Sequence, residues 1–110
     1  MATYMILFRF TQKGIEEIKD SPARITAAKE IISKMGGEVR AFYAILGSQY
    51  DTMFILDAPN DEKLGGMVLE IARLGYVRTQ THQLFNEYEY GKIISSRDEH
   101  ANGNGHERAD

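Results

Sequence analysis

The sequence has 110 residues, which is the usual size of one domain and enough to bury a core without metals or crosslinks. Its 43% hydrophobic and 26% charged residues match globular proteins and argue against disordered, fibrous or membrane classes. With 13 basic against 16 acidic residues, a net charge of −3, the chain lacks the positive excess that nonspecific phosphate binding needs, so we expect no nucleic-acid partner.

Cysteine is absent, which excludes disulfides and thiolate chemistry. The first residues carry no basic segment and their apolar run breaks at Arg9, which is unlike a signal peptide. The longest apolar stretches are shorter than the roughly 20 residues that a membrane helix needs. We therefore expect a cytoplasmic protein that has no membrane partner.

The first third of the chain predicts a strand and a helix. Residues 3–11 are apolar on both faces, which is typical of a central strand. A short amphipathic piece lies around Gly14. Ser21-Pro22 then supplies an N-cap residue and a proline at the first helical position, and apolar residues repeat every three or four positions as far as Gly36-Gly37. This pattern predicts a helix over 22–35 with a left-handed glycine stop.

A β-hairpin is predicted next. Residues 38–48 alternate as a strand does, with one face made of Val39, Ala41, Tyr43 and Ile45 and the other of Arg40, Phe42, Ala44 and Leu46. Gly47-Ser48 predicts a tight turn, since glycine tolerates the positive φ that such turns require. The partner strand is expected at 50–57.

The last predicted elements are a helix and a strand. Ala58-Pro59 ends the previous strand, and Asn60 can cap a helix with acidic residues in its first turn. The expected buried stripe of this helix is Leu64, Met67, Val68, Ile71 and Leu74. Gly75 is a natural terminator, and residues 76–85 predict the last strand.

The end of the chain differs in composition from the rest. From Ser95 onward no aliphatic residue is larger than alanine, so this segment cannot anchor itself in a core. The sequence therefore predicts one domain over 1–94 and a disordered polar tail over 95–110.

The element order βαββαβ with right-handed crossovers predicts an α+β, ferredoxin-like fold, in which two helices cover one face of a four-stranded antiparallel sheet. The first strand carries apolar residues of both parities, with Tyr4, Ile6 and Phe8 opposed to Met5 and Leu7. The second sheet face should therefore pack on something. The economical partner is a second copy, which would make a homodimer or a higher homo-oligomer with a barrel interior suited to a small molecule.

Five local motifs follow one another along residues 3–86: Lys19-Asp20-Ser21-Pro22-Ala23-Arg24, Ala41-Phe42-Tyr43, Gly47-Ser48-Gln49-Tyr50-Asp51, Ala58-Pro59-Asn60-Asp61-Glu62 and Leu74-Gly75-Tyr76-Val77-Arg78-Thr79-Gln80-Thr81. In this order and spacing the chain resembles the GYD family, small proteins grouped with dimeric α/β barrels. The family's signature has one residue between its glycine and Tyr-Asp, whereas two residues separate Gly47 from Tyr50 here. The resemblance implies the fold and little chemistry.

Six polar side chains are candidates for lining the barrel and binding a ligand: Arg9, Tyr43, Tyr50, Asp51, Arg78 and His82. Asp51 at the hairpin could serve as a base or a hydrogen-bond anchor, or its carboxylate could bond the turn backbone instead. The arginines in strands could meet an anionic ligand, or they could pair with an acid of this chain or of a partner subunit.

The remaining candidates also have bland interpretations. His82 is the histidine inside the predicted domain, where it could titrate near neutral pH, but a lone histidine on a strand is more often structural. Tyr43 could supply a hydroxyl to a cavity or serve as core and interface material. No motif calls for a cofactor, and the spacing of the histidines predicts no metal site.

Two functions remain open from the sequence. The first is a homodimeric barrel that binds a small molecule, in one version an anionic one, with a cofactor-independent enzyme as its catalytic form. The alternative is a noncatalytic assembly or regulatory subunit that acts through protein–protein contacts. A closed pocket with convergent polar groups would favour the first, and an interior filled by apolar side chains would favour the second.

Overall fold

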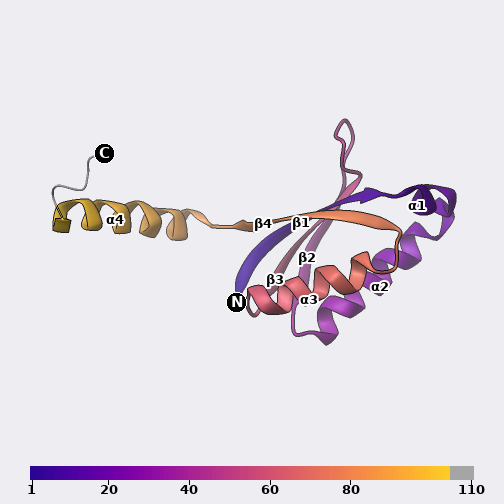
Figure 1. Cartoon of the computed structure of the whole chain (residues 1–110), viewed down its shortest axis with the longest axis horizontal. Helices are drawn as coiled ribbons and strands as arrows, with labels where there is room; N and C mark the ends of the chain where they lie inside the picture. The colour runs from indigo at the N-terminus through magenta and orange to yellow at the C-terminus, as the bar shows by residue number, and fades with distance from the viewer. Residues whose placement is uncertain (105–110) are drawn as a thin grey trace.

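The computed structural model describes the backbone of residues 1–104 and the side chains of residues 1–97. The elements in chain order are β1 (Ala2–Phe10), α1 (Gln12–Glu16), the 3₁₀ turn η1 (Ile18–Asp20), α2 (Ser21–Lys34), β2 (Glu38–Ala44), β3 (Thr52–Ala58), α3 (Asp61–Ala72), β4 (Val77–Leu84) and α4 (Glu87–Asn104) (Figure 1). The predicted ferredoxin-like α+β fold is confirmed.

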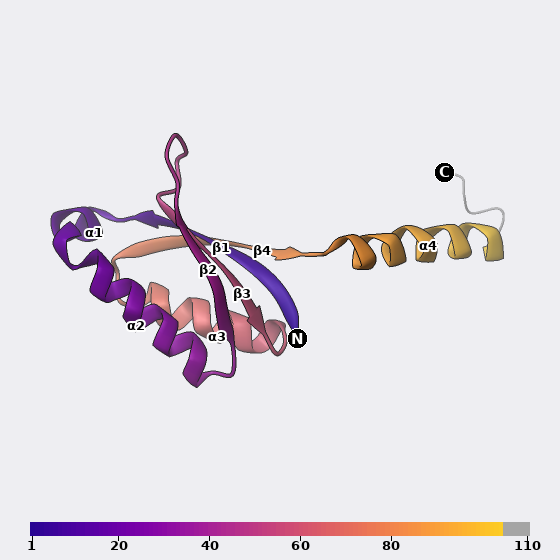
Figure 2. The ribbon, with the colours of Figure 1, turned by 180° about the vertical axis from the view of Figure 1, so that it is seen from behind.

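The four strands form one antiparallel sheet in the order β2-β3-β1-β4. Both long helices, α2 and α3, lie on the same side of this sheet, and the two opposite views agree on this (Figures 1 and 2). We call the other side the open face. Alternation along the strands assigns to it these residues: Thr3, Met5, Leu7, Arg9, Ala41, Tyr43, Met53, Ile55, Asp57, Arg78, Gln80, His82 and Leu84.

The hydrophobic core fills the space between the sheet and the two helices. Its side chains without measurable exposure come from both layers, with Ile6 on β1, Ile32 on α2 and Met67 on α3. Phe54 on β3 stands at the centre, where its ring makes edge contacts with Phe8 and with Phe42. The parity predicted for β1 is confirmed, since Tyr4, Ile6 and Phe8 are its buried residues.

The helix ends mostly follow the predicted signals. The Asn60 side chain accepts a hydrogen bond of 2.8 Å from the backbone N–H of Lys63, so it caps α3 as expected. Gly36 and Gly75 have φ of 91° and 87°, the left-handed conformation predicted at both helix stops. The predicted cap at Ser21 is wrong, because η1 runs directly into α2 and makes Ser21 the first helical residue.

The face assignment predicted for β2 is wrong. The pairing of β2 with β3 shifts between Val39 and Ala41, which leaves Arg40 as the extra residue of a β-bulge. The bulge interrupts simple alternation, so Val39 and Phe42 both pack against the core although they are an odd number of residues apart. Strict period-two counting cannot anticipate an inserted residue.

A hydrogen bond from the Tyr4 hydroxyl to the Asp61 carboxylate ties β1 to the first turn of α3. This bond, assisted by burial and by the Asp61 charge, raises the pKa of Tyr4 above its usual 10.0.

We expect Tyr4→Phe to lower the free energy of unfolding by about 1 kcal/mol at neutral pH, because one part-buried hydrogen bond is lost. Since the pKa of Tyr4 is raised by folding, the bond's contribution is complete below pH 10.0 and declines as the pH rises through the folded value. Urea unfolding across an alkaline pH series should therefore show the two proteins converging. A difference that grew with pH would contradict this account.

Helix α4 extends away from the sheet and helices as a separate arm (Figures 1 and 2). It continues the direction of β4 and gives the chain a longest extent of 58 Å against 31 and 22 Å in the other directions. The sequence does not predict this helix, which crosses the boundary expected at residue 94. Residues 105–110 of the predicted tail lie outside the described residues.

Candidate functional site

The centre of the open face is apolar. Met5 and Leu7 of β1 lie beside Met53 and Ile55 of β3, and all four side chains are half-buried although no element covers them. Tyr43 on β2 stands directly opposite Met53 and is 60% exposed. The structure therefore places this candidate at the border of an uncovered apolar surface.

Arg9 and Arg78 stand directly opposite each other on β1 and β4. We call them the arginine pair. Both side chains are exposed, and neither forms an ion pair within the described residues. Arg78 donates one long hydrogen bond of 3.4 Å to the carbonyl of Val77. Because like charges directly opposite on neighbouring strands are destabilising, the arginine pair would gain from an acid supplied from outside this sheet.

His82 occupies the same face as the arginine pair but lies at a distance from it. It stands opposite Met5, four residues beyond Arg78 along β4. At about 3.3 Å per residue, this spacing separates the two backbones by roughly 13 Å. The exposed imidazole therefore forms no cluster with the guanidinium groups.

Asp51 holds backbone together at the base of the hairpin. Its Oδ2 accepts a hydrogen bond of 2.9 Å from the backbone N–H of Phe10, and its own N–H donates to the carbonyl of Phe8 at 2.8 Å. The carboxylate thus fastens the end of β1, rather than the turn. Tyr50 beside it is half-buried, and its N–H donates to the Ser48 hydroxyl at 3.1 Å.

A mixed polar and apolar groove of about 360 Å³ lies at the end of the open face where α4 begins. Asp57 is its most connected group, because its carboxylate accepts from the Thr3 hydroxyl and pairs with Arg40, both at 2.8 Å. The groove is completed by Met1, Leu84, Phe85, Asn86 and Glu89. None of the six candidates lines it, since the residues after β4 were not expected to turn back toward the sheet end.

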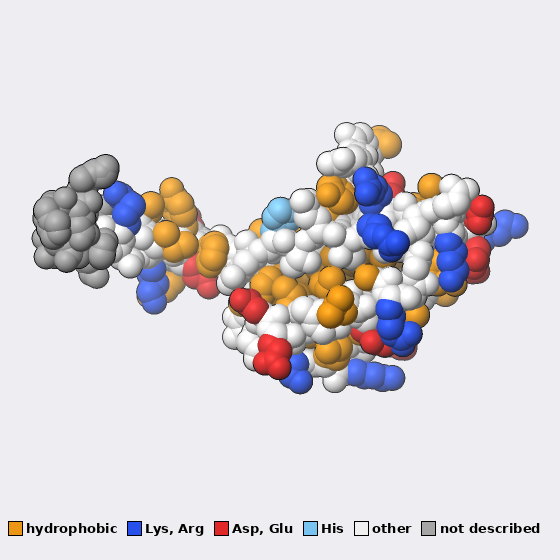
Figure 3. Space-filling view, in the orientation of Figure 1, with side chains coloured by type: hydrophobic (Ala, Val, Ile, Leu, Met, Phe, Trp, Pro, Cys, Tyr) orange, Lys and Arg blue, Asp and Glu red, His pale blue; other side chains and the backbone are white. Residues whose placement is uncertain are grey.

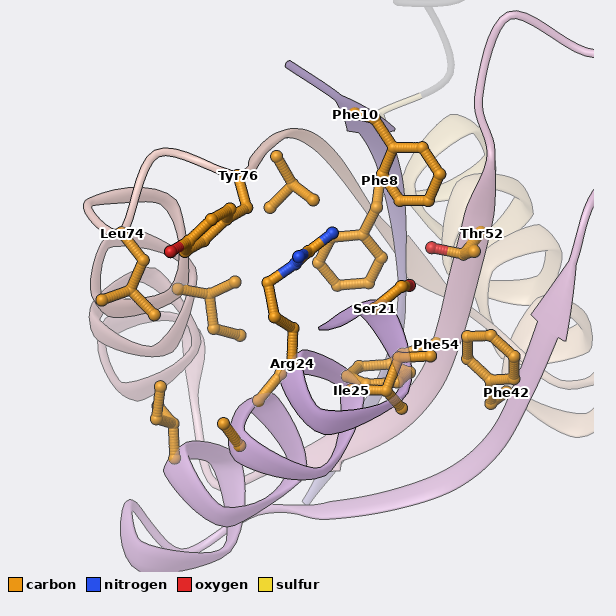
Figure 4. A pocket seen from close by; sticks show the side chains of 15 residues that line it. Phe8, Phe10, Ser21, Arg24, Ile25, Phe42, Thr52, Phe54, Leu74 and Tyr76 are labelled. Carbon is orange, nitrogen blue, oxygen red and sulfur yellow. The ribbon is translucent and has the colours of Figure 1, made fainter. Parts of the chain in front are cut away.

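A second hollow, of about 80 Å³, lies on the helix side between α2 and the sheet (Figure 4). Its walls are mostly aromatic and aliphatic, and the Arg24 guanidinium reaches into it over the Tyr76 ring at 4.5 Å. Arg24 also donates to the carbonyls of Glu17 and Gly14, at 2.7 and 3.2 Å. This arginine therefore links α2 to the segment before it, and none of the six candidates lines this hollow either.

Metal and membrane features are absent from the part of the chain that the structure describes. Among those residues, no three histidine, aspartate or glutamate side chains gather closely enough to hold a metal ion. No described helix is both long and apolar enough to cross a bilayer. The open face, the arginine pair and the groove are thus the features from which a function can be argued.

Similar proteins agree with this architecture. A protein of Thermus thermophilus described as a glutamine synthetase and cystathionine beta-lyase binding protein is 30% identical over 82 residues, covering 74% of this chain and 85% of that protein. The crystal structure of a second Thermus thermophilus chain, TTHA0845, has a TM-score of 0.52 at 27% identity, covering 80% of this chain and 98% of the other.

Solved regulatory proteins share the fold. The feast or famine regulatory protein of M. tuberculosis, complexed with L-methionine, has a TM-score of 0.60 at 16% identity, covering 80% of this chain. This chain spans about half, 52%, of that protein's length, and at this identity the likeness shows the fold alone. The family model for the GYD domain matches residues 4–94, which is most of the described chain. The chain belongs to the GYD domain family.

Proposed function

We propose that this chain is a homodimeric binding protein that acts through protein–protein contacts, with the two copies joined through their open faces. The carrying observation is the uncovered apolar centre of the sheet, where Met5, Leu7, Met53 and Ile55 are half-buried and lack a covering layer. Contiguous apolar surface of this kind usually marks an interaction site. A two-fold partner covers it with the same residues from a second copy.

The polar candidates also fit an interaction role better than a reaction site. Asp51 is engaged with the backbone of β1, and His82 lies roughly 13 Å from Arg78. A reacting group needs a base and an electrostatic partner within hydrogen-bond reach of one point. The spread of these side chains across the face supports recognition of a broad surface.

The relative from Thermus thermophilus, which is named for binding two enzymes, supports the same proposal. We extend that role to this chain as a binding protein for enzymes of amino-acid metabolism. Surface plasmon resonance with glutamine synthetase and cystathionine beta-lyase from the chain's own host tests it directly. Saturable binding of either enzyme supports the proposal, and binding of neither contradicts the extension from the relative.

The open-face dimer predicts a large effect for Leu7→Glu. Because a carboxylate would be buried at the centre of the interface, we expect the dimer dissociation constant to rise about 100-fold. Leu69→Glu is the matched control, since Leu69 is 72% exposed on the outer side of α3. Sedimentation equilibrium measures both constants, and circular dichroism checks that both variants fold. Equal effects of the two substitutions would rule out the open face as the interface.

Small-molecule binding between the paired sheets is the second candidate, favoured by the groove around Thr3, Arg40 and Asp57. A dimer would enclose this groove, and its paired cation and carboxylate could orient a small polar ligand. Native mass spectrometry of protein purified from its own host separates the candidates. A reproducible bound mass supports a ligand, whereas a dimer of twice the chain mass leaves the protein-binding role.

A further inference from the structure

Helix α4 has the composition of an interface helix but no interface within its own chain. Past its first turn it makes no extensive contact with any other element of the described chain. Orange side chains stand out along it in Figure 3, well apart from the body of the molecule. An isolated helix of 18 residues is marginal in water, because most helical stability in proteins comes from packing of an apolar side.

The apolar side chains of α4 are arranged on one side. Tyr90, Ile93 and Ile94 are spaced by three and four residues, which puts them together on the helix surface as an apolar stripe. Tyr88 lies on the other side, where the Lys92 ammonium stands 5.4 Å from the centre of its ring. The stripe is therefore a surface for packing, and the exposed Tyr90 and Ile93 are still without a layer above them.

The first turn of α4 is acidic. Asn86 and Glu89 form a capping box, in which each side chain accepts a 2.8 Å hydrogen bond from the other residue's backbone N–H. Glu87 adds a second carboxylate to the same turn, and its side chain is exposed. The arm thus begins with two negative charges, which match the two positive charges of the arginine pair.

These charges cannot meet within one chain. Arg78 begins β4 and Glu87 follows its end, so at about 3.3 Å per residue they are more than about 20 Å apart. That separation exceeds the screening length of roughly 8 Å at physiological salt. Any coupling between Glu87 and Arg78 must therefore act between two copies.

We infer that α4 is an arm that grips a second copy of this chain, with the acidic first turn of each arm against the arginine pair of the other copy. The inference rests on the open-face dimer proposed above. If the two sheets face each other with their strands running in opposite directions, the end of β4 in one copy lies over the start of β4 in the other. The arm then leaves beside Arg9 and Arg78 of the second copy, and its stripe continues along that copy.

The test is a charge-reversal cycle in the full chain, read as the dimer dissociation constant by sedimentation equilibrium. The variants are Glu87→Lys, Arg78→Glu and the double variant, compared with the unchanged protein. A two-fold dimer repeats every contact twice, so we expect each single reversal to weaken the dimer about tenfold, or about 1.4 kcal/mol. The double variant should return to within about threefold of the original, because opposite charges again face each other.

Glu62→Lys is the matched control. Glu62 is also an exposed acid in the first turn of a helix, α3, so this reversal has the same unfavourable interaction with the helix dipole but lies on the helix side of the sheet. It should leave the dissociation constant unchanged. High salt should weaken the original dimer and leave both single variants less affected, since screening acts on the attraction that they lack.

The outcomes separate the arm from the dimer itself. If the two reversals are additive, so that the double variant is about 100-fold weaker, Glu87 and Arg78 do not meet and the arm inference is overturned. If Leu7→Glu dissociates the dimer in that case, the open-face dimer still stands without the arm. A protein that stays monomeric at every concentration would overturn both.

Discussion

Phe54→Ala should lower the free energy of unfolding by about 3–5 kcal/mol. Phe54 is 1% exposed, and it lies between the rings of Phe8 and Phe42 at centroid distances of 5.2 and 6.1 Å. Truncation removes the transfer free energy of a whole ring and leaves a cavity that a sheet residue on β3 cannot collapse to fill. It also removes two edge contacts between aromatic rings, which add to the area term.

The measurement is urea unfolding followed by circular dichroism, with Leu69→Ala as the control. Leu69 is 72% exposed on α3, so its truncation should change stability by less than about 0.5 kcal/mol. A loss below about 1 kcal/mol for Phe54→Ala would mean that the two helices do not close over the centre of the sheet.

Gly14→Ala is expected to destabilise the protein by about 3 kcal/mol, at the upper end for overpacking. A Cβ at this buried position would stand 2.2 Å from the carbonyl oxygen of Tyr76. That oxygen already accepts a 3.0 Å hydrogen bond from Thr11, so it cannot withdraw without breaking the link between β1 and the start of β4. The Gly14 carbonyl also accepts from Arg24, which extends the disturbance to α2.

Gly65→Ala is the natural comparison and should act in the opposite direction. Gly65 lies inside α3, and a Cβ there would have no neighbour within 4 Å. Alanine should therefore stabilise the chain by about 1 kcal/mol, because glycine is the poorer helix former. Thermal unfolding of both variants gives the signs directly, and a stabilising Gly14→Ala would contradict the close approach to Tyr76.

The fold could be predicted from the sequence wherever a local signal coincided with a tertiary role. The apolar parity of Tyr4, Ile6 and Phe8, the Asn60 cap and the left-handed Gly36 and Gly75 all act locally, and each has its predicted place. The β2 pattern failed because a bulge depends on the partner strand, which a single strand's alternation does not encode.

The candidate site was harder to predict than the fold. The sequence singled out Arg9, Arg78 and His82, but only strand register shows that the arginines stand side by side and that His82 lies apart. Asp51 carried a turn signal, whereas its bond reaches Phe10, which is 41 residues away. The arm was missed because its few apolar residues, with Gly91 among them, make a weak helical pattern.

The bulge at Arg40 has a further consequence for how this protein can associate. Strands β2 and β4 border the sheet, and each presents a row of backbone groups to which a foreign strand could add. On β2 the row is interrupted by the bulge and flanked by the charged Glu38 and Arg40. On β4 it is lined by polar side chains from Arg78 to Gln83. Lateral growth into ribbons is thereby disfavoured, and a chain that still lacks its partner is directed toward closed pairing through its apolar face.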